Sequence, residues 1–98
     1  LKDRRILAEE GFISIFLAIE TQTGKCVVGP EIHARGFAED DSIFDEIRPK
    51  ILAALEEAAG QGVRDTHQFS QTVRRTVGRW VGTRIRRRPM IVPVVIEA

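Results

Sequence analysis

Apolar residues crowd three short stretches of the chain, and each stretch predicts a β-strand. The stretches are residues 12–20 (FISIFLAIE), 26–37 (CVVGPEIHARGF) and 90–97 (MIVPVVIE). All three are rich in the β-branched and aromatic residues that strands favour. Between the first two, Gly24 is free to adopt a positive φ, which predicts a hairpin turn. Proline has no N–H group for a ladder, so Pro30 indicates a bulge or an edge position, and Pro93 a free edge along the third strand.

Between the second and third strands, apolar residues recur every three or four positions, which predicts two helices. The first set is Phe44, Ile47, Ile51, Leu55 and Ala58, and the second is Phe69, Val73, Val77, Trp80 and Val81. Ser42 is the expected N-cap of the first helix, and Asp65 or Thr66 that of the second. Pro49 would cost about 3 kcal/mol inside a helix. We favour a kinked helix over 42–59; alternatively, the regular helix begins near Pro49.

The order strand, strand, helix, helix, strand predicts an α+β fold, in which a three-stranded β-sheet is packed on one face by two α-helices. Residues 12–98 are expected to form this single domain. Residues 1–11 have a helix-like composition but are too few to be stable alone, so we interpret them as a linker tail or a docking segment. The order of the strands within the sheet stays open.

The first strand is apolar on both of its faces. Ile13, Ile15, Leu17 and Ile19 can face the helices, so that the next set points the other way: Phe12, Phe16 and Ala18. The third strand is equally apolar on both faces. Since two helices cannot cover both sides of a sheet, these residues predict a partner-facing apolar surface. The alternative is that residues 1–8 fold over this surface and hide it.

The composition is that of a soluble globular domain, with 43% hydrophobic and 30% charged residues in 98. The longest apolar run is too short to cross a bilayer, so no membrane contact is expected. The single cysteine, Cys26, excludes an internal disulfide and fits a reducing cytoplasm. The chain begins with Leu1, which indicates a piece of a longer protein.

The net charge of +1 is a cancellation between two segments of opposite sign. Residues 39–57 contain seven acids and two bases, whereas residues 64–88 contain eight arginines and one acid. Arg75, Arg79 and Arg86 lie within about 40° of each other on a helical wheel. With the two arginines that follow, they are the candidate RNA phosphate contacts: Arg75, Arg79, Arg86, Arg87 and Arg88. The alternative is a solvated helix face whose arginines pair with the acidic first helix.

Residues with the potential for catalysis or metal binding are few. His33 and His67 are the only histidines, and no H-x-H, H-E-x-x-H or C-x-x-C spacing exists. Cys26 at a strand start is typical of a small hydrophobe. The acids that precede the first helix lack the spacing of a calcium loop and fit helix capping. The sequence therefore predicts no catalytic residue, no metal ligand and no cofactor in this chain.

Several segments resemble the C-terminal domain of bacterial ribonuclease J. They are LKDRRILAEEG, the hairpin TGK with GPEIHARGF, the helix segment VRRTVGRW and the ending RRRPMIVPVVIEA. The resemblance covers the whole chain, and residues 87–93 are its most specific part. It implies a small three-stranded sheet against two helices that supports oligomer assembly and the activity of the whole enzyme.

The resemblance also implies the chemistry of the longer enzyme. Ribonuclease J is a metallo-β-lactamase/β-CASP enzyme of RNA maturation and decay. It acts with zinc in the cytoplasm as a 5′→3′ exoribonuclease that also cuts internally. Its metal-binding H-x-H-x-D-H motif is missing here, so no catalytic residue carries over. The implied partners are the catalytic body of the same polypeptide, a second copy of the chain, or both, with weak RNA contact as the alternative function.

Overall fold

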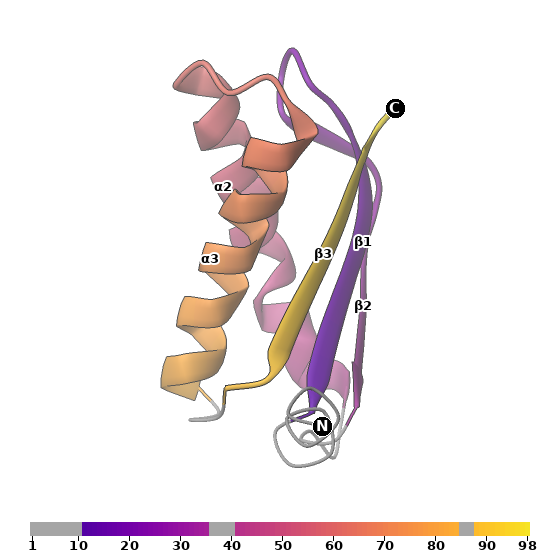
Figure 1. Cartoon of the computed structure of the whole chain (residues 1–98), viewed down its shortest axis with the longest axis vertical. Coiled ribbons are helices and arrows are strands. Elements are labelled where there is room, and N and C mark those ends of the chain that lie inside the picture. The colour runs from indigo at the N-terminus through magenta and orange to yellow at the C-terminus, as the bar shows by residue number, and fades with distance from the viewer. Residues whose placement is uncertain (1–10, 36–40, 85–87) are drawn as a thin grey trace, which may run out of the picture.

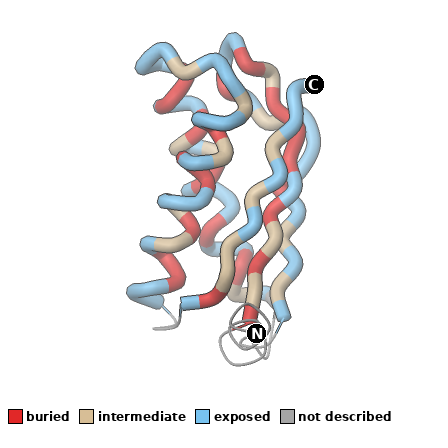
Figure 2. Tube along the Cα trace, viewed as in Figure 1, coloured by how far each residue is buried: buried red, intermediate tan, exposed pale blue. Residues whose placement is uncertain are grey.

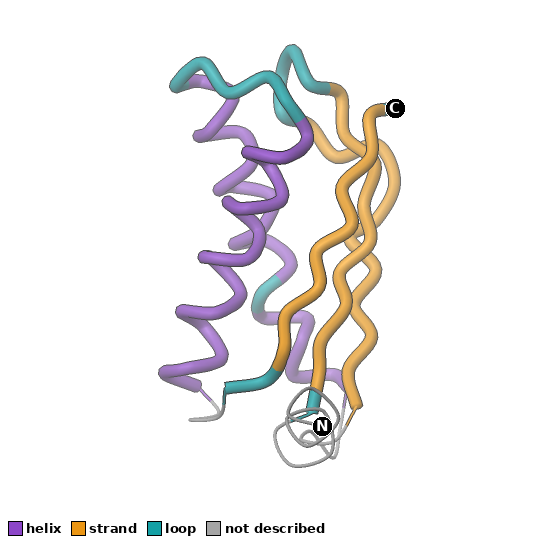
Figure 3. Tube along the Cα trace, in the orientation of Figure 1, coloured by secondary structure: helices purple, strands orange, loops and turns teal. Residues whose placement is uncertain are grey.

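The chain folds into two layers, a three-stranded sheet and a pair of helices on one side of it (Figures 1 and 3). The computed structural model describes residues 11–35, 41–84 and 88–98. Its elements are β1 (Phe12–Glu20), β2 (Lys25–Arg35), the 3-10 helix η1 (Asp41–Glu46), α2 (Arg48–Gly60), α3 (Thr66–Arg84) and β3 (Met90–Glu97). The α+β prediction is confirmed. The interpretation of residues 1–11 as a linker tail or docking segment, and the alternative that residues 1–8 cover the sheet, concern residues 1–10, which lie outside the described residues.

The sheet has the strand order β2-β1-β3, which the sequence left open. β1 and β2 form the predicted hairpin and pair antiparallel, whereas β3 pairs parallel to β1. Gly24 in the hairpin turn has a φ of +74°, and a Cβ atom there would lie 2.5 Å from the carbonyl oxygen of Leu55 in α2. Only glycine meets both conditions, because it tolerates positive φ and has no Cβ.

The prolines lie where the sequence predicts. Pro30 is in β2 and Pro93 is in β3, and both strands are edges of the sheet. The register of β1 against β2 also shifts between Phe16 and Ala18, which is a bulge close to Pro30. Both the bulge and the edge position are therefore confirmed for β2, as is the free edge along β3.

The core lies between the helices and the inner face of the sheet (Figure 2). The four predicted inner residues of β1, which are Ile13, Ile15, Leu17 and Ile19, are all fully buried. The predicted apolar stripes of the two helices pack against them, from Phe44 to Ala58 and from Phe69 to Val81. No helix in the described ranges is long and apolar enough to cross a membrane.

The first helical region differs from the favoured interpretation. It is not one kinked helix from Ser42, because η1 ends at Glu46 and α2 begins only at Arg48. Pro49 lies in the first turn of α2, where a missing N–H group costs no helical hydrogen bond. Ser42 therefore does not cap α2, which starts after Ile47 without a side-chain cap. The alternative interpretation, a helix that starts near Pro49, is correct.

Asp65 caps α3. The backbone N–H of Gln68 donates a hydrogen bond of 2.9 Å to Oδ1 of Asp65. In an N-cap, the side chain of the capping residue accepts from the backbone N–H group three residues later. The bond therefore identifies Asp65, and not Thr66, as the cap. Fixing the start of α3 also fixes which of its side chains face the sheet and which face away.

Candidate docking and nucleic-acid surfaces

The face of the sheet opposite the helices has no described element against it (Figure 1). We call it the open face. The strand register defines four rows across it: Met90–Phe12–Arg35, Val92–Ser14–His33, Val94–Phe16–Glu31 and Ile96–Ala18–Val28. Side chains of neighbouring strands at the same level project together, so each row is a contiguous strip.

The open face is apolar along β1 and β3. Among its large apolar side chains, Phe16 is 37% exposed, Val94 41% and Ile96 45%. Val92 and Val28 are exposed to a similar degree. These side chains form one patch on the described surface, which is the usual signature of an interaction site rather than of scattered surface residues.

The three predicted partner-facing residues all lie on the open face, but they differ in exposure. Phe16 is exposed and Phe12 is half-buried, whereas Ala18 is only 5% exposed between Val28 and Ile96. Its larger neighbours in the row, Val28 and Ile96, offer the contact surface instead. The alternation along β3 already pointed to Val92, Val94 and Ile96, which the prediction did not name.

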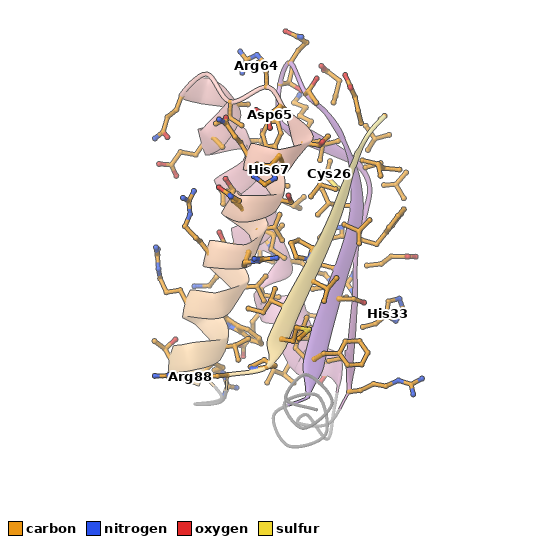
Figure 4. The ribbon with its side chains drawn as sticks, in the orientation of Figure 1. Cys26, His33, Arg64, Asp65, His67 and Arg88 are labelled. Carbon is orange, nitrogen blue, oxygen red and sulfur yellow. The ribbon has the colours of Figure 1, made fainter. Side chains whose placement is uncertain are left out.

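Polar residues border the patch along β2. Glu31, His33 and Arg35 are exposed and alternate with residues that face the core. Figure 4 shows His33 pointing away from the helices. An apolar centre with a polar rim is the general anatomy of a protein–protein interface.

Prolines blunt both edges of the sheet. The backbone N–H of Met90 donates to the carbonyl oxygen of Gly11 at 3.1 Å, and that of Ala98 donates to the carbonyl oxygen of Ile19 at 2.8 Å. The N–H and C=O groups of successive residues in a strand point to opposite sides. Those of the even-numbered residues of β3 therefore point to β1, and the backbone nitrogen of Pro93 points to the free edge. Pro30 lies at the bulge of the other edge strand, β2, and has no N–H group to donate. The free edge of β3 therefore lacks a donor at Pro93, which opposes the addition of another strand there.

The candidate arginines are only partly brought together. Arg75 and Arg79 are exposed on the side of α3 that faces α2. Arg88 is exposed beyond the C-terminal end of α3 and does not line the space between the helices (Figure 4). Arg86 and Arg87 lie outside the described residues. The described part of the arginine surface is therefore the pair Arg75 and Arg79.

A groove runs between the two helices on the surface that faces away from the sheet. We call it the helical groove. Its lining comes from Lys50, Ala53, Ala54, Glu57, Ala58 and Gln61 of α2, and from Thr72, Arg75, Thr76, Arg79, Trp80 and Thr83 of α3. Two adjoining hollows share residues from both helices, which makes the groove continuous. Arg75 and Arg79 lie on its α3 side, with Lys50 of α2 across from Arg79.

Within the described residues, the acidic first helical region pairs with one arginine of α3, and that arginine is Arg84. Its Nε atom lies 3.1 Å from Oε2 of Glu46. The hydrogen bond from Arg84 holds the pKa of the Glu46 carboxyl below its ordinary value. Across the described ranges, no ion pair within 4.0 Å includes Arg75 or Arg79. The carboxylate-pairing alternative therefore accounts for Arg84 and leaves the groove arginines without an acidic partner.

The described residues offer no cluster for metal binding or nucleophilic catalysis. They contain no group of three or more His, Cys, Asp or Glu side chains placed to hold a metal ion. His33 lies on β2 and His67 on α3, in separate parts of the molecule (Figure 4). Burial raises the pKa of the Cys26 thiol, whose Sγ donates to the carbonyl of Val28 at 3.1 Å. A protonated thiol is a poor nucleophile.

The comparison with known proteins points to one family. The family model described as the ribonuclease J C-terminal domain matches residues 1–98. Ribonuclease J of Mycobacterium tuberculosis is 41% identical over 93 residues, which are 95% of this chain and 17% of the relative. Ribonuclease J of Corynebacterium glutamicum is 34% identical over 97 residues, 98% of this chain and 14% of the relative. Ribonuclease J 2 of Staphylococcus epidermidis is 29% identical over 100 residues, 99% of this chain and 18% of the relative. The chain thus spans about one sixth of the curated relatives that it matches.

Proposed function

The chain belongs to the family of ribonuclease J C-terminal domains, and from this premise we propose that it is a non-catalytic assembly domain of a ribonuclease J-like enzyme. The longer enzyme would cleave RNA with zinc, as a 5′→3′ exoribonuclease and endoribonuclease of RNA maturation and decay in the cytoplasm. The described residues do not form a zinc site, so the metal would be held elsewhere in the polypeptide. The role of this domain is then to keep the subunits of the enzyme associated.

The open face is the observation that carries the assembly role. It combines an exposed apolar centre on β1 and β3 with a polar rim on β2. The edges of the sheet are less suited to docking, because Pro93 removes a donor from the free edge of β3 and Pro30 interrupts β2 at its bulge. A partner is therefore expected to pack on the face of the sheet and not to extend it.

We assign the open face to a second copy of the chain. A two-fold axis that crosses the strands near Phe16 and Val94 would pack β3 on β3 in opposite directions. Val92 of one copy would then face Ile96 of the other, and the apolar half of each sheet would meet its equivalent.

The size of the open face sets the strength of this contact. Three strands of this length cover about 26 by 14 Å, or about 350 Å². Stable specific interfaces bury about 800 Å² on each partner. The isolated chain should therefore self-associate weakly. In the whole enzyme, other contacts would add to the interface.

The test is sedimentation of the 98-residue chain over a concentration series. Self-association is expected at high micromolar concentration, and Val94→Lys should weaken it at least tenfold, because two lysines would meet at the two-fold axis. Val94 is 41% exposed, so the fold tolerates the change. Gln68→Lys is the matched control, since it adds the same charge on the helical layer.

Two results would contradict the assignment. The first is a strict monomer at all concentrations, and the second is equal weakening by Val94→Lys and Gln68→Lys. If the monomeric chain binds the remainder of the enzyme through the open face, the catalytic body is the occupant and the second copy is not.

A second candidate function is auxiliary, sequence-independent contact with RNA. The observation that favours it is the absence of a carboxylate partner at Arg75 and Arg79 within the described residues. Neighbouring arginines without a carboxylate within ion-pair distance are suited to phosphate binding.

A further inference from the structure

We propose that the helical groove binds the sugar–phosphate backbone of single-stranded RNA, with Arg75 and Arg79 on neighbouring phosphates and Lys50 facing Arg79 from α2. The inference rests on the proposed function only in taking RNA as the ligand, and it does not depend on the open face.

The charges of the groove favour an anion. Its lining has three cations, Lys50, Arg75 and Arg79, against one acid, Glu57. Arg75 and Arg79 are one helical turn apart, about 6 Å along the axis. This separation fits consecutive phosphates of an extended strand. Because neither guanidinium has an acidic partner in the described residues, neither must give one up to bind phosphate.

The floor of the groove leaves room for a backbone but not for stacked bases. Ala53, Ala54 and Ala58 line its α2 side with side chains that end at Cβ. The groove follows α3 from Thr72 to Thr83, about 16 Å, which suits a short run of nucleotides. Its one aromatic, Trp80, is only 6% exposed, so it offers no stacking platform. Binding should therefore be independent of base sequence.

The hydroxyl groups of the groove favour RNA over DNA. Thr76 Oγ1 donates to the carbonyl of Thr72 at 2.8 Å, and Thr83 Oγ1 donates to that of Arg79 at 3.1 Å. Each hydroxyl proton is thus committed to the helix, and only lone pairs remain for a ligand. Phosphate oxygens cannot donate to them, but a ribose 2′-hydroxyl can.

The first experiment measures fluorescence anisotropy of a labelled oligouridine with the 98-residue chain at low salt. Arg79→Gln should weaken binding at least threefold, whereas Arg74→Gln should leave it within error. Arg74 is the matched control, because it lies on the same helix but lines the hollow beside β3. The double change Arg75→Gln with Arg79→Gln should reduce the slope of log K against log salt by about 1.4, since each phosphate contact on a single strand contributes about 0.7.

The second experiment reverses the sign of the effect. Glu57→Gln removes the one acid of the groove lining and should tighten binding at least twofold. Glu56→Gln is its control, since this neighbour on α2 is exposed and does not line the groove. A gain of affinity at one position and not at the next cannot result from loss of folding.

Several outcomes would overturn the inference. They are no binding at low salt, equal losses for Arg79→Gln and Arg74→Gln, equal affinity for oligothymidine, or equal affinity for polyglutamate. The last two would identify a general polyanion surface. Sedimentation separates this failure from failure of the assembly role, because the groove variants leave the open face intact and should self-associate as the unchanged chain does.

Discussion

Gly24 serves both the hairpin turn and the packing of the sheet against the helices. Its positive φ closes the hairpin, and its missing side chain allows the turn to approach the carbonyl of Leu55 and the Cβ of Ala59. The sequence predicts the φ from a glycine within a turn. It does not predict the contact, because Leu55 and Ala59 belong to a helix that lies more than 30 residues away.

Gly24→Ala should lower the free energy of unfolding by at least about 1–2 kcal/mol, because alanine combines a strained φ with a backbone clash. Chemical denaturation of the two proteins measures the difference. Gly62→Ala separates the two causes, since Gly62 also has a positive φ, of +101°, but open space around it. If both variants lose the same stability, the contact with α2 contributes nothing.

At the scale of the element, β3 explains why the sheet stays at three strands. The strand is parallel to β1, apolar on both faces and free along one edge. Such an edge is a template for strand addition, and natural proteins block it in several ways. Pro93 blocks this edge, because it presents no N–H group in the middle of the strand.

Pro93→Val restores that donor and should convert weak, reversible association into aggregation through the edge. Sedimentation and light scattering over time will detect the change, with an expected increase in large species at concentrations where the unchanged chain has none. Val is chosen because it favours strands and fits the half-buried position. Ile91→Val is a suitable comparison on the same strand, since it leaves the number of edge donors unchanged and lies on the inner face of the sheet. Equal solubility of Pro93→Val and the unchanged chain would contradict a protective role.

At the scale of the whole molecule, the two candidate surfaces lie on opposite layers. The open face belongs to the sheet, and the helical groove lies between the two helices of the other layer. Figure 1 shows the two layers side by side. A partner on one would leave the other accessible. The domain could therefore hold the enzyme together and contact RNA at the same time.

The separation predicts that the two activities can be removed independently. Val94→Lys should reduce self-association and bind oligouridine as Gln68→Lys does, while Arg79→Gln should do the reverse. Sedimentation and anisotropy on the same three proteins provide the comparison. Loss of both activities in either Val94→Lys or Arg79→Gln would indicate that the surfaces are coupled or that the fold is damaged.

The sequence by itself determined the elements and most of their inner faces. The spacing of apolar residues along the chain determines both the type of element and the face that it buries. The inner side of β1, the apolar stripe of α3 and the span of β3 were therefore all predicted from the sequence. The positions of Pro30 and Pro93 were predicted from the missing N–H group of proline, whereas the N-cap of α3 was left open between Asp65 and Thr66. The start of α2 was the exception, because a kink at Pro49 and a start near Pro49 satisfy the same spacing.

Only the tertiary structure decided the strand order, the parallel pairing of β3 and the partners of the arginines. Each depends on contacts between residues far apart in the chain, such as Arg84 and Glu46, which are 38 positions apart. A helical wheel places Arg75 and Arg79 opposite the apolar stripe of α3 and Arg84 on the side of that stripe, but it does not say which of them meets a carboxylate. That choice follows from how α3 packs beside η1 and α2, and periodicity along one element contains no information about its neighbours.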